Sequence, residues 1–272
     1  MWIKEKKRQI IQVICAVLYN CNFRGFADGE IYKGSVKSIC MPGLNCYSCP
    51  GAIASCPIGS LQTALVSSRY KMPYYVIGLL LIFGVLLGRT ICGYLCPFGL
   101  LQEILYLLPT KKVKKGRWTR TLSRLKYFIL VIFVIGIPLI LASPGFCKYI
   151  CPAGSLEGGI PLVAMNEQLR ELTGGLFSWK VFLMIGILVS AVFIYRSFCR
   201  FICPLGAFYS LFNRISLVGM KVDEEKCTGC QACVRNCRMD VKRVGDHECI
   251  QCGECMKDCA FAAIRFETCL KK

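Results

Sequence analysis

Three stretches of the chain, residues 72–88, 127–143 and 178–195, are apolar and almost free of charged side chains. Each is close to the ~17–20 residues that an α-helix needs to cross ~30 Å of hydrocarbon. Inside a bilayer the backbone must satisfy all its hydrogen bonds internally, which favours helices packed in a bundle. The composition agrees, because 55% of the residues are hydrophobic and only 18% are charged. We therefore expect a membrane protein of the all-α class.

A fourth segment, residues 10–23, is shorter and is interrupted by Gln12, Asn20 and Asn22. It follows a basic N-terminus, as the apolar part of a signal peptide does, but no small-x-small cleavage site comes after it. We expect it to be an uncleaved first span, which brings the total to four transmembrane helices. A helix lying in the membrane interface is the alternative.

Basic residues set the expected orientation. No acidic residue occurs between Glu103 and Glu157, and short basic loops stay in the cytoplasm. The N-terminus, this loop and the tail after Arg196 are therefore expected inside, with residues 24–71 and 146–177 outside. Between two spans, such a loop predicts a topology signal and contact with anionic lipid, and nucleic acid is not an expected partner. The basic residues of the loop are Lys111, Lys112, Lys114, Lys115, Arg117, Arg120, Arg124 and Lys126.

After residue 220 the sequence changes to a polar, cysteine-dense tail, so we expect two domains, residues 1–220 and 221–272. Two runs of four cysteines share the same spacing, and they are Cys227, Cys230, Cys233, Cys237 and Cys249, Cys252, Cys255, Cys259. This is the spacing of bacterial ferredoxins with two [4Fe-4S] clusters, in which the fourth cysteine of each run ligates the other cluster. We expect an α+β ferredoxin-like fold with one cluster on Cys227, Cys230, Cys233 and Cys259 and the other on Cys249, Cys252, Cys255 and Cys237. A zinc module is the alternative, which two complete runs disfavour.

A second pattern, Cys-Pro-x-Gly, occurs four times and is therefore an internal repeat. Its cysteines are Cys56, Cys96, Cys151 and Cys203, and the last three are preceded four residues earlier by Cys92, Cys147 and Cys199. The first copy instead follows Cys40, Cys46 and Cys49. The proline ends the preceding turn and suits the first position of a new helix, whose free N–H groups favour a thiolate at the break.

The expected topology decides which cysteine pairs meet. Cys92 and Cys96 follow the second span and Cys199 and Cys203 follow the fourth, so these four predict an inner [4Fe-4S] cluster at the cytoplasmic face. Cys147 and Cys151 follow the third span at the opposite face. An outer cluster should combine them with two or more of Cys40, Cys46, Cys49 and Cys56.

Six outer cysteines are more than one cluster needs, and the sequence does not assign the surplus. Disulfide bonds among them are the alternative, since the outer compartment can be oxidising. Cys15, Cys21 and Cys269 lie outside the repeats and are interpreted as buried or incidental thiols.

The sequence lacks the residues that other redox groups and common catalytic sites require. His247 is the only histidine, so a b-type haem with two histidine ligands is excluded, and no Cys-x-x-Cys-His motif exists for a c-type haem. No Gly-rich nucleotide loop is present. Glu157 and Glu167 lie near the outer cysteines and are interpreted as surface carboxylates.

Two-span units that end in Cys-x3-Cys-Pro, followed by a tail with eight cysteines, resemble the NapH/NosR/CcoG-type membrane polyferredoxins. The resemblance covers roughly residues 88–266 and is best at 92–99 and 198–208. It implies electron transfer at the cytoplasmic membrane. The outer cysteines at 40–56 and 147–151 exceed the NapH pattern, which disfavours a NapH role in nitrate respiration and favours a conduit with one more relay point.

The expected function is transfer of single electrons from a cytoplasmic ferredoxin or flavodoxin-like donor, through the tail, inner and outer clusters, to an extracytoplasmic flavoprotein or another redox partner at the membrane. An acidic donor would be steered by the basic inner face. The chain is thus expected to be an electron-transfer subunit of an oxidoreductase system rather than a stand-alone enzyme. Two alternatives stay open: a membrane reductase of a small acceptor such as a metal ion or quinone, and a redox sensor or assembly factor.

Overall fold

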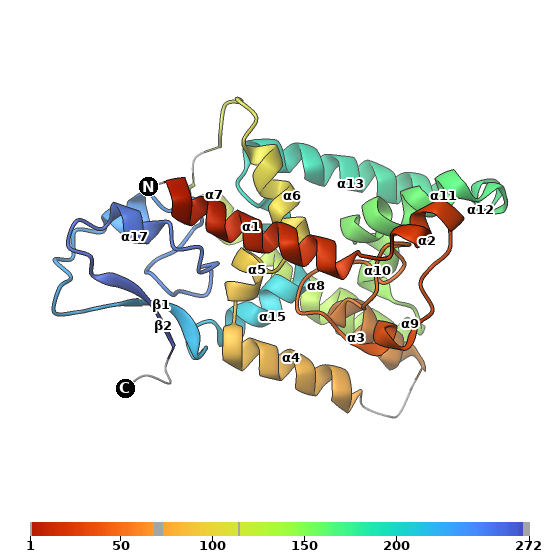
Figure 1. The fold of residues 1–272 in the computed structure, drawn as a ribbon, viewed down its shortest axis with the longest axis horizontal. Coiled ribbons are helices and arrows are strands. Elements are labelled where there is room, and N and C mark those ends of the chain that lie inside the picture. The colour runs from red at the N-terminus through yellow and green to blue at the C-terminus, as the bar shows by residue number, and fades with distance from the viewer. Residues whose placement is uncertain (1, 68–72, 114, 269–272) are drawn as a thin grey trace.

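The computed structural model describes residues 2–67, 73–113 and 115–268, which fold mostly into helices (Figure 1). In chain order the helical elements are α1 (Trp2–Tyr19), α2 (Phe23–Asp28), η1 (Ser35–Ser38), α3 (Pro57–Ser67), α4 (Tyr74–Leu87), α5 (Thr90–Tyr94), α6 (Pro97–Tyr106), α7 (Arg117–Leu122), α8 (Leu125–Ile129), η2 (Leu130–Gly136), α9 (Ile137–Leu141), α10 (Gly145–Tyr149), η3 (Gly154–Gly159), α11 (Ile160–Met165), α12 (Glu167–Glu171), α13 (Gly175–Phe193), α14 (Ser197–Phe201), α15 (Pro204–Phe212), α16 (Ala232–Arg235) and α17 (Cys255–Asp258). Of the residues used in the sequence predictions, Met72, Lys114 and Cys269 lie outside the described residues.

A two-stranded antiparallel sheet closes the tail, with β1 (Val218–Val222) paired to β2 (Ile264–Thr268). The register places Met220 opposite Phe266. Helices α1, α4 and α13 run roughly along the long axis of the molecule, and the N-terminus lies at the same end as the tail (Figure 1). The fold is therefore an elongated helical body with a small α+β tail at one end.

Within the described part of the chain, two helices are long and apolar enough to cross a membrane, Arg117–Leu141 and Gly175–Phe193. They correspond to the spans predicted at 127–143 and 178–195. In place of the span predicted at 72–88, α4 is apolar but has only 14 residues, about 21 Å of helix. The structure thus supports two of the four predicted spans by length and composition.

The predicted first span differs most from the structure. Residues 10–23 do not form one helix, because α1 begins at Trp2 and ends at Tyr19, and α2 starts only at Phe23. The break coincides with the asparagines at positions 20 and 22, whose amides bond to the backbone oxygens of Ala16 and Pro50. The bond from Asn20 to the preceding turn is local, and such bonds compete with a continuing helix, whereas the bond from Asn22 ties the break to a distant loop.

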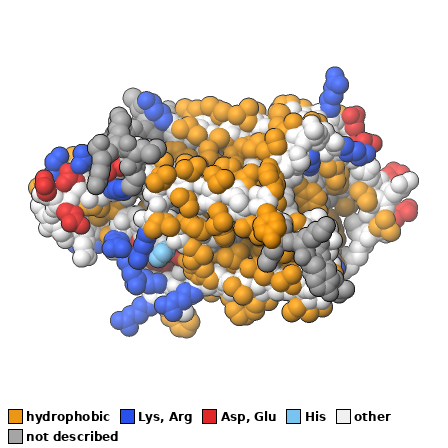
Figure 2. All heavy atoms as spheres, turned by 90° about the horizontal axis from the view of Figure 1, so that it is seen from below, with side chains coloured by type: hydrophobic (Ala, Val, Ile, Leu, Met, Phe, Trp, Pro, Cys, Tyr) orange, Lys and Arg blue, Asp and Glu red, His pale blue; other side chains and the backbone are white. Residues whose placement is uncertain are grey.

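The outer surface of the helical body is apolar. Figure 2 shows a broad hydrophobic band over the middle of the molecule, with charged side chains gathered towards the two ends. Ile140 in α9 is 76% exposed and Phe182 in α13 is 72% exposed. Contiguous apolar surface of this kind is rare on soluble monomers beyond a few hundred Å², and it suits a lipid environment.

A buried carboxylate joins the N-terminal helix to the body. Glu103 in α6 accepts hydrogen bonds from Arg8 Nη2 at 2.8 Å and from Arg196 Nε at 3.0 Å, and also from the hydroxyl of Tyr195. Burial alone would raise the pKa of Glu103, but the two guanidinium groups outweigh it and lower that pKa below its ordinary value. The interaction keeps α1, α6 and the start of α14 together.

A second buried carboxylate docks the tail on the helical body. Glu248 accepts hydrogen bonds from Arg89 Nη1 at 3.0 Å and from Lys126 Nζ at 2.6 Å. The sequence counted Lys126 among the basic residues of the loop, and the structure shows its side chain fully buried against the tail. Lys115 of the same loop donates to the backbone oxygen of Cys237 at 3.0 Å. The tail and the basic loop therefore lie at the same end of the molecule.

Candidate iron–sulfur sites

Each Cys-Pro-x-Gly copy forms the start of a helix. Cys96 and Cys203 are the N-cap residues of α6 and α15, and a proline follows each one in the first helical turn. The glycine N–H then faces the cysteine, with Gly206 N at 3.3 Å from Cys203 Sγ and Gly154 N at 3.4 Å from Cys151 Sγ. The motif thus places a sulfur where the orphan N–H groups of a helix N-terminus point, which stabilises a thiolate or a cluster bound through it.

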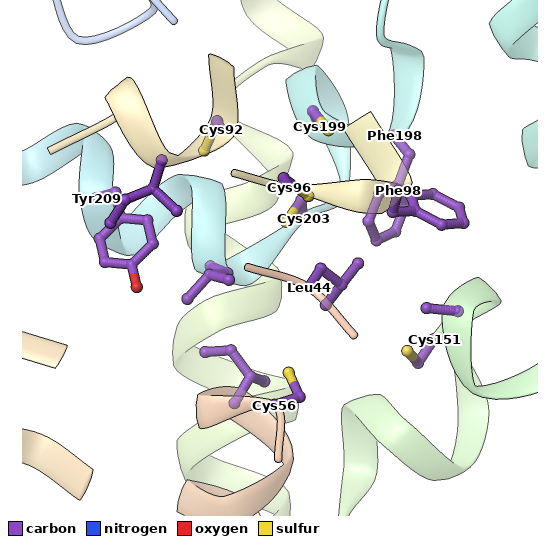
Figure 3. Packing of buried hydrophobic residues seen from close by; sticks show 14 of the residues in the cluster. Leu44, Cys56, Cys92, Cys96, Phe98, Cys151, Phe198, Cys199, Cys203 and Tyr209 are labelled. Atoms are coloured by element: carbon purple, nitrogen blue, oxygen red, sulfur yellow. The ribbon is translucent and has the colours of Figure 1, made fainter. Parts of the chain in front are cut away.

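The inner cysteines lie together, as the predicted topology requires. Cys92 in α5, Cys96, Cys199 in α14 and Cys203 are all buried. Figure 3 shows the four side chains grouped around one region between α5, α14 and the starts of α6 and α15. Burial and the neighbouring thiols of Cys199 and Cys92 raise the pKa of Cys96 to about 12. Burial also raises the pKa values of Cys199 and Cys203. Thiols of this kind suit a shared cationic metal core, which would supply the missing positive charge.

The outer site is a cavity of ≈ 200 Å³. Four of the six outer cysteines line it, namely Cys46, Cys56, Cys147 and Cys151. Cys40 and Cys49 are buried but do not line it. Lys180 also lines the cavity, and a cation there suits a thiolate-ligated cluster, which carries net negative charge. The structure therefore brings four outer cysteines together around the cavity and leaves Cys40 and Cys49 outside it.

The tail cysteines surround two further hollows. Cys227, Cys230, Cys233 and Cys259 line a wide, open one, and Cys237, Cys249, Cys252 and Cys255 line a small one together with Cys233. These groups contain the two predicted ligand sets in full. Gly229 and Gly253 have φ of +70° and +78°, a backbone region that glycine adopts without strain.

The described residues fit clusters better than single metal ions. Among them, no three His, Cys, Asp or Glu side chains converge as the ligands of one ion would. The outer and tail cysteines instead line hollows, as a cubane requires, since each thiolate binds a different iron. No disulfide joins the described cysteines, which are all free thiols.

Two glutamines connect the repeat copies in pairs, and sequence reasoning missed their role. Gln102 Nε2 donates to Cys199 Sγ at 3.1 Å, and its Oε1 accepts from Phe198 N at 3.0 Å. Gln62 makes the same two bonds at the outer site. Its Nε2 donates to Cys147 Sγ at 3.3 Å, and its Oε1 accepts from Phe146 N at 2.9 Å. The first copy thus pairs with the third, and the second with the fourth.

The signal was present in the sequence, because both glutamines follow the motif cysteine by six residues. The same position holds Glu157 in the third copy and Tyr209 in the fourth. Glu157 is not the free surface carboxylate that the sequence predicted, since its Oε2 accepts a hydrogen bond from Cys46 N at 2.7 Å. Burial raises the pKa of Glu157 to about 7, although the Cys46 N–H opposes the rise.

The tail and inner sites lie against each other. A Cβ on Gly93, which stands between Cys92 and Cys96, would meet the backbone oxygen of Ile250 at 2.3 Å. Ile250 lies between the ligand candidates Cys249 and Cys252. Only glycine permits this approach of two backbones, so the contact between the tail and the inner site is built into the motif.

Comparison with known families identifies the cofactor. A family described as "4Fe-4S binding domain" matches residues 72–116, 125–160 and 176–222, which include the inner four cysteines with Cys147 and Cys151. A second family of the same description matches residues 220–243, in the tail. The prediction of [4Fe-4S] clusters is thereby confirmed.

Three curated relatives are informative. An uncharacterized protein of Methanocaldococcus jannaschii is 28% identical over 193 residues, which cover 68% of this chain and 65% of that protein. YccM of Escherichia coli K12, named as a candidate electron transport protein, is 24% identical over 182 residues, 65% of this chain and 49% of its own length. The methylamine utilization ferredoxin-type protein MauN of Paracoccus denitrificans is 25% identical over 243 residues, 87% of this chain and 77% of MauN. No solved structure matches the chain.

Proposed function

Because the chain is a 4Fe-4S polyferredoxin of the NapH/NosR type, we propose that it carries single electrons across a membrane, from a donor at its tail to an acceptor at its outer site. Electron transport through 4Fe-4S domains is the general function of such proteins. Bound clusters supply the redox chemistry, and the protein positions them and tunes their potentials.

The observation that supports this proposal is an uninterrupted series of four cysteine groups. Cys233 lines both tail hollows, so those two sites are neighbours. Gly93 brings the second tail site against the inner site, and Leu44 of the buried segment 42–45 lies between the inner and outer sites (Figure 3). Each step is therefore shorter than the ~30 Å of hydrocarbon that a single transfer would have to cross.

Two features support the proposal that the chain spans the membrane: the apolar band around the helical body and the distribution of basic residues. Under this proposal α13 and the helix from Arg117 to Leu141 span the bilayer, with α1 and α4 completing the lipid-facing surface. The basic loop packs on the tail through Lys115, and basic loops stay in the cytoplasm. The N-terminus and the tail are then cytoplasmic, and the outer site faces the other side.

The proposed donor is an acidic ferredoxin or flavodoxin-like protein of the cytoplasm. The chain carries a net charge of +18, and its tail presents Cys227 and Cys230 at the surface, where a donor would dock. The proposed acceptor is an extracytoplasmic flavoprotein or another redox partner at the membrane.

Iron and labile sulfide analysis of the anaerobically purified full-length protein tests the cluster count. We expect about four clusters per chain, or ~16 iron atoms at four per cluster. The outer cysteines supply a matched pair of variants. Cys46→Ser should lose about one cluster, whereas Cys49→Ser, which removes a buried thiol outside the cavity, should lose none. Equal iron contents in the two variants, or iron for the tail only in the wild type, would contradict the proposal.

A further inference from the structure

One buried segment separates the inner and outer sites. Residues Pro42, Gly43, Leu44 and Asn45 have almost no exposed surface although they belong to a loop. Figure 3 shows Leu44 between the inner cysteines Cys96 and Cys203 on one side and the outer cysteines Cys56 and Cys151 on the other. Loops normally run over a protein surface, so this burial needs a cause.

The segment touches the inner site through its backbone. A Cβ on Gly43 would lie 3.1 Å from the backbone oxygen of Leu95 and 3.3 Å from Cys96 Cα. The next peptide N–H, that of Leu44, lies close enough to the Cys96 thiol to favour its thiolate form. The glycine thus permits a close approach, and the N–H that follows it points at a predicted cluster ligand.

The same segment touches the outer site one residue later. Leu44, Asn45 and Cys46 line the outer cavity. The peptide N–H of Asn45 lies close enough to the thiol of Cys56, a predicted outer ligand, to favour its thiolate form. Two consecutive peptide N–H groups therefore serve two different cysteine sites.

Side chains from both halves of the repeat hold the segment in place. The hydroxyl of Tyr209, from the fourth copy, donates to Pro42 O at 3.1 Å, and Glu157, from the third copy, accepts from Cys46 N at 2.7 Å. The amides of Asn45 and Asn20 exchange hydrogen bonds of 3.0 and 3.2 Å. The equivalent position of the third and of the fourth repeat copy thus fixes one end of the segment each.

We propose that residues 42–46 are the bridge through which an electron passes between the inner and outer sites, with the Leu44 and Asn45 N–H groups joining a sulfur ligand of each. The inference rests on the proposed function. One electron leaves the inner site and enters the outer site, so the first is oxidised and the second reduced by one, and no covalent bond changes. Tyr209 and Gly43 act as positioning residues for this bridge.

Electron paramagnetic resonance of the full-length protein reduced with dithionite tests the closeness of the two sites. If one peptide unit separates them, their reduced clusters should show spin–spin coupling, and Cys147→Ser/Cys151→Ser should abolish it. Simple addition of two uncoupled spectra would overturn the bridge while leaving both clusters, and thus the proposed function, in place. Absence of any outer cluster in the wild type would overturn both.

Paired variants then test the bridge itself. Gly43→Ala forces a methyl group against two backbone atoms, whereas Gly78→Ala in α4 meets nothing within 4 Å. Tyr209→Phe frees Pro42 O, whereas Tyr127→Phe removes a hydroxyl that bonds Ser210 Oγ instead. We expect Gly43→Ala and Tyr209→Phe to slow inner-to-outer transfer by about tenfold to a hundredfold while both cluster signals persist, and the two controls to leave it unchanged. Wild-type rates in both bridge variants would refute the inference.

Discussion

Replacing Gln102 with leucine separates cluster tuning from cluster binding. Gln102 is fully buried, its Nε2 donates to Cys199 Sγ at 3.1 Å, and it is not itself a predicted ligand. A donor to a ligand sulfur stabilises the reduced cluster more than the oxidised one, because reduction adds negative charge. Gln102→Leu should therefore lower the reduction potential of the inner cluster and leave its iron in place.

The magnitude follows from the strength of that bond. Hydrogen bonds to charged groups contribute ~1.5–3 kcal/mol, and only the difference between the two redox states, about 1 kcal/mol, shifts the potential. A tenfold change in a one-electron equilibrium is about 59 mV and about 1.4 kcal/mol, so the shift is about −40 mV. The variant should also lose ~1–3 kcal/mol of stability, because Phe198 N no longer has its 3.0 Å acceptor.

Redox titration followed by electron paramagnetic resonance measures the shift cluster by cluster. Gln62→Leu is the matched variant, since Gln62 makes the same two bonds at the outer site. Gln102→Leu should shift only the reduction potential of the inner cluster, and Gln62→Leu only that of the outer cluster. The other three potentials should stay unchanged in each variant. A shift of the tail clusters, or no shift of the inner potential in Gln102→Leu, would refute the assignment of Cys199 as an inner ligand.

Three further outcomes are expected. Gly93→Ala places a methyl group 2.3 Å from Ile250 O, so it should slow electron entry from the tail into the inner site while the iron content stays constant, as stopped-flow reduction would show. Glu103→Gln leaves Arg8 and Arg196 buried without their counter-charge and should cost about 3–5 kcal/mol in thermal or denaturant unfolding, unlike the half-exposed control Glu267→Gln. Because the pKa of Glu103 is lowered in the folded protein, its stabilisation is present above the unfolded value of ~4.3 and is lost as the pH falls through the lower folded value. Wild type should accordingly lose stability below about pH 4, and Glu103→Gln should lose less over the same range in the same unfolding assay.

The sequence predicted those parts of the site whose spacing is local. Three thiols in a Cys-x2-Cys-x2-Cys run must wrap one cluster, and Cys92 and Cys96 are tied together by a single turn and a proline. The grouping of these two with Cys199 and Cys203 followed from topology alone, because both pairs come after spans that end on the same face.

Other features depend on long-range packing that no local pattern encodes. The sequence gives no reason to prefer Cys46 over Cys49 as a ligand, and only the fold places Cys46 on the outer cavity. Lys126 has the sequence context of an exposed lysine until the tail supplies Glu248, more than a hundred residues later. The break after Tyr19 depends on Asn20 and Asn22, whose backbone partners become visible only in the structure.

Outward electron transfer in sealed vesicles tests the central claim most directly. The full-length protein is reconstituted with a reduced ferredoxin inside and a membrane-impermeant acceptor outside, with the tail facing inwards. We predict reduction of the external acceptor by the wild type and its loss in Cys147→Ser/Cys151→Ser, while the tail clusters still accept electrons from inside. Undiminished reduction by that variant, or none by a wild type that holds all its clusters, would contradict a relay across the membrane.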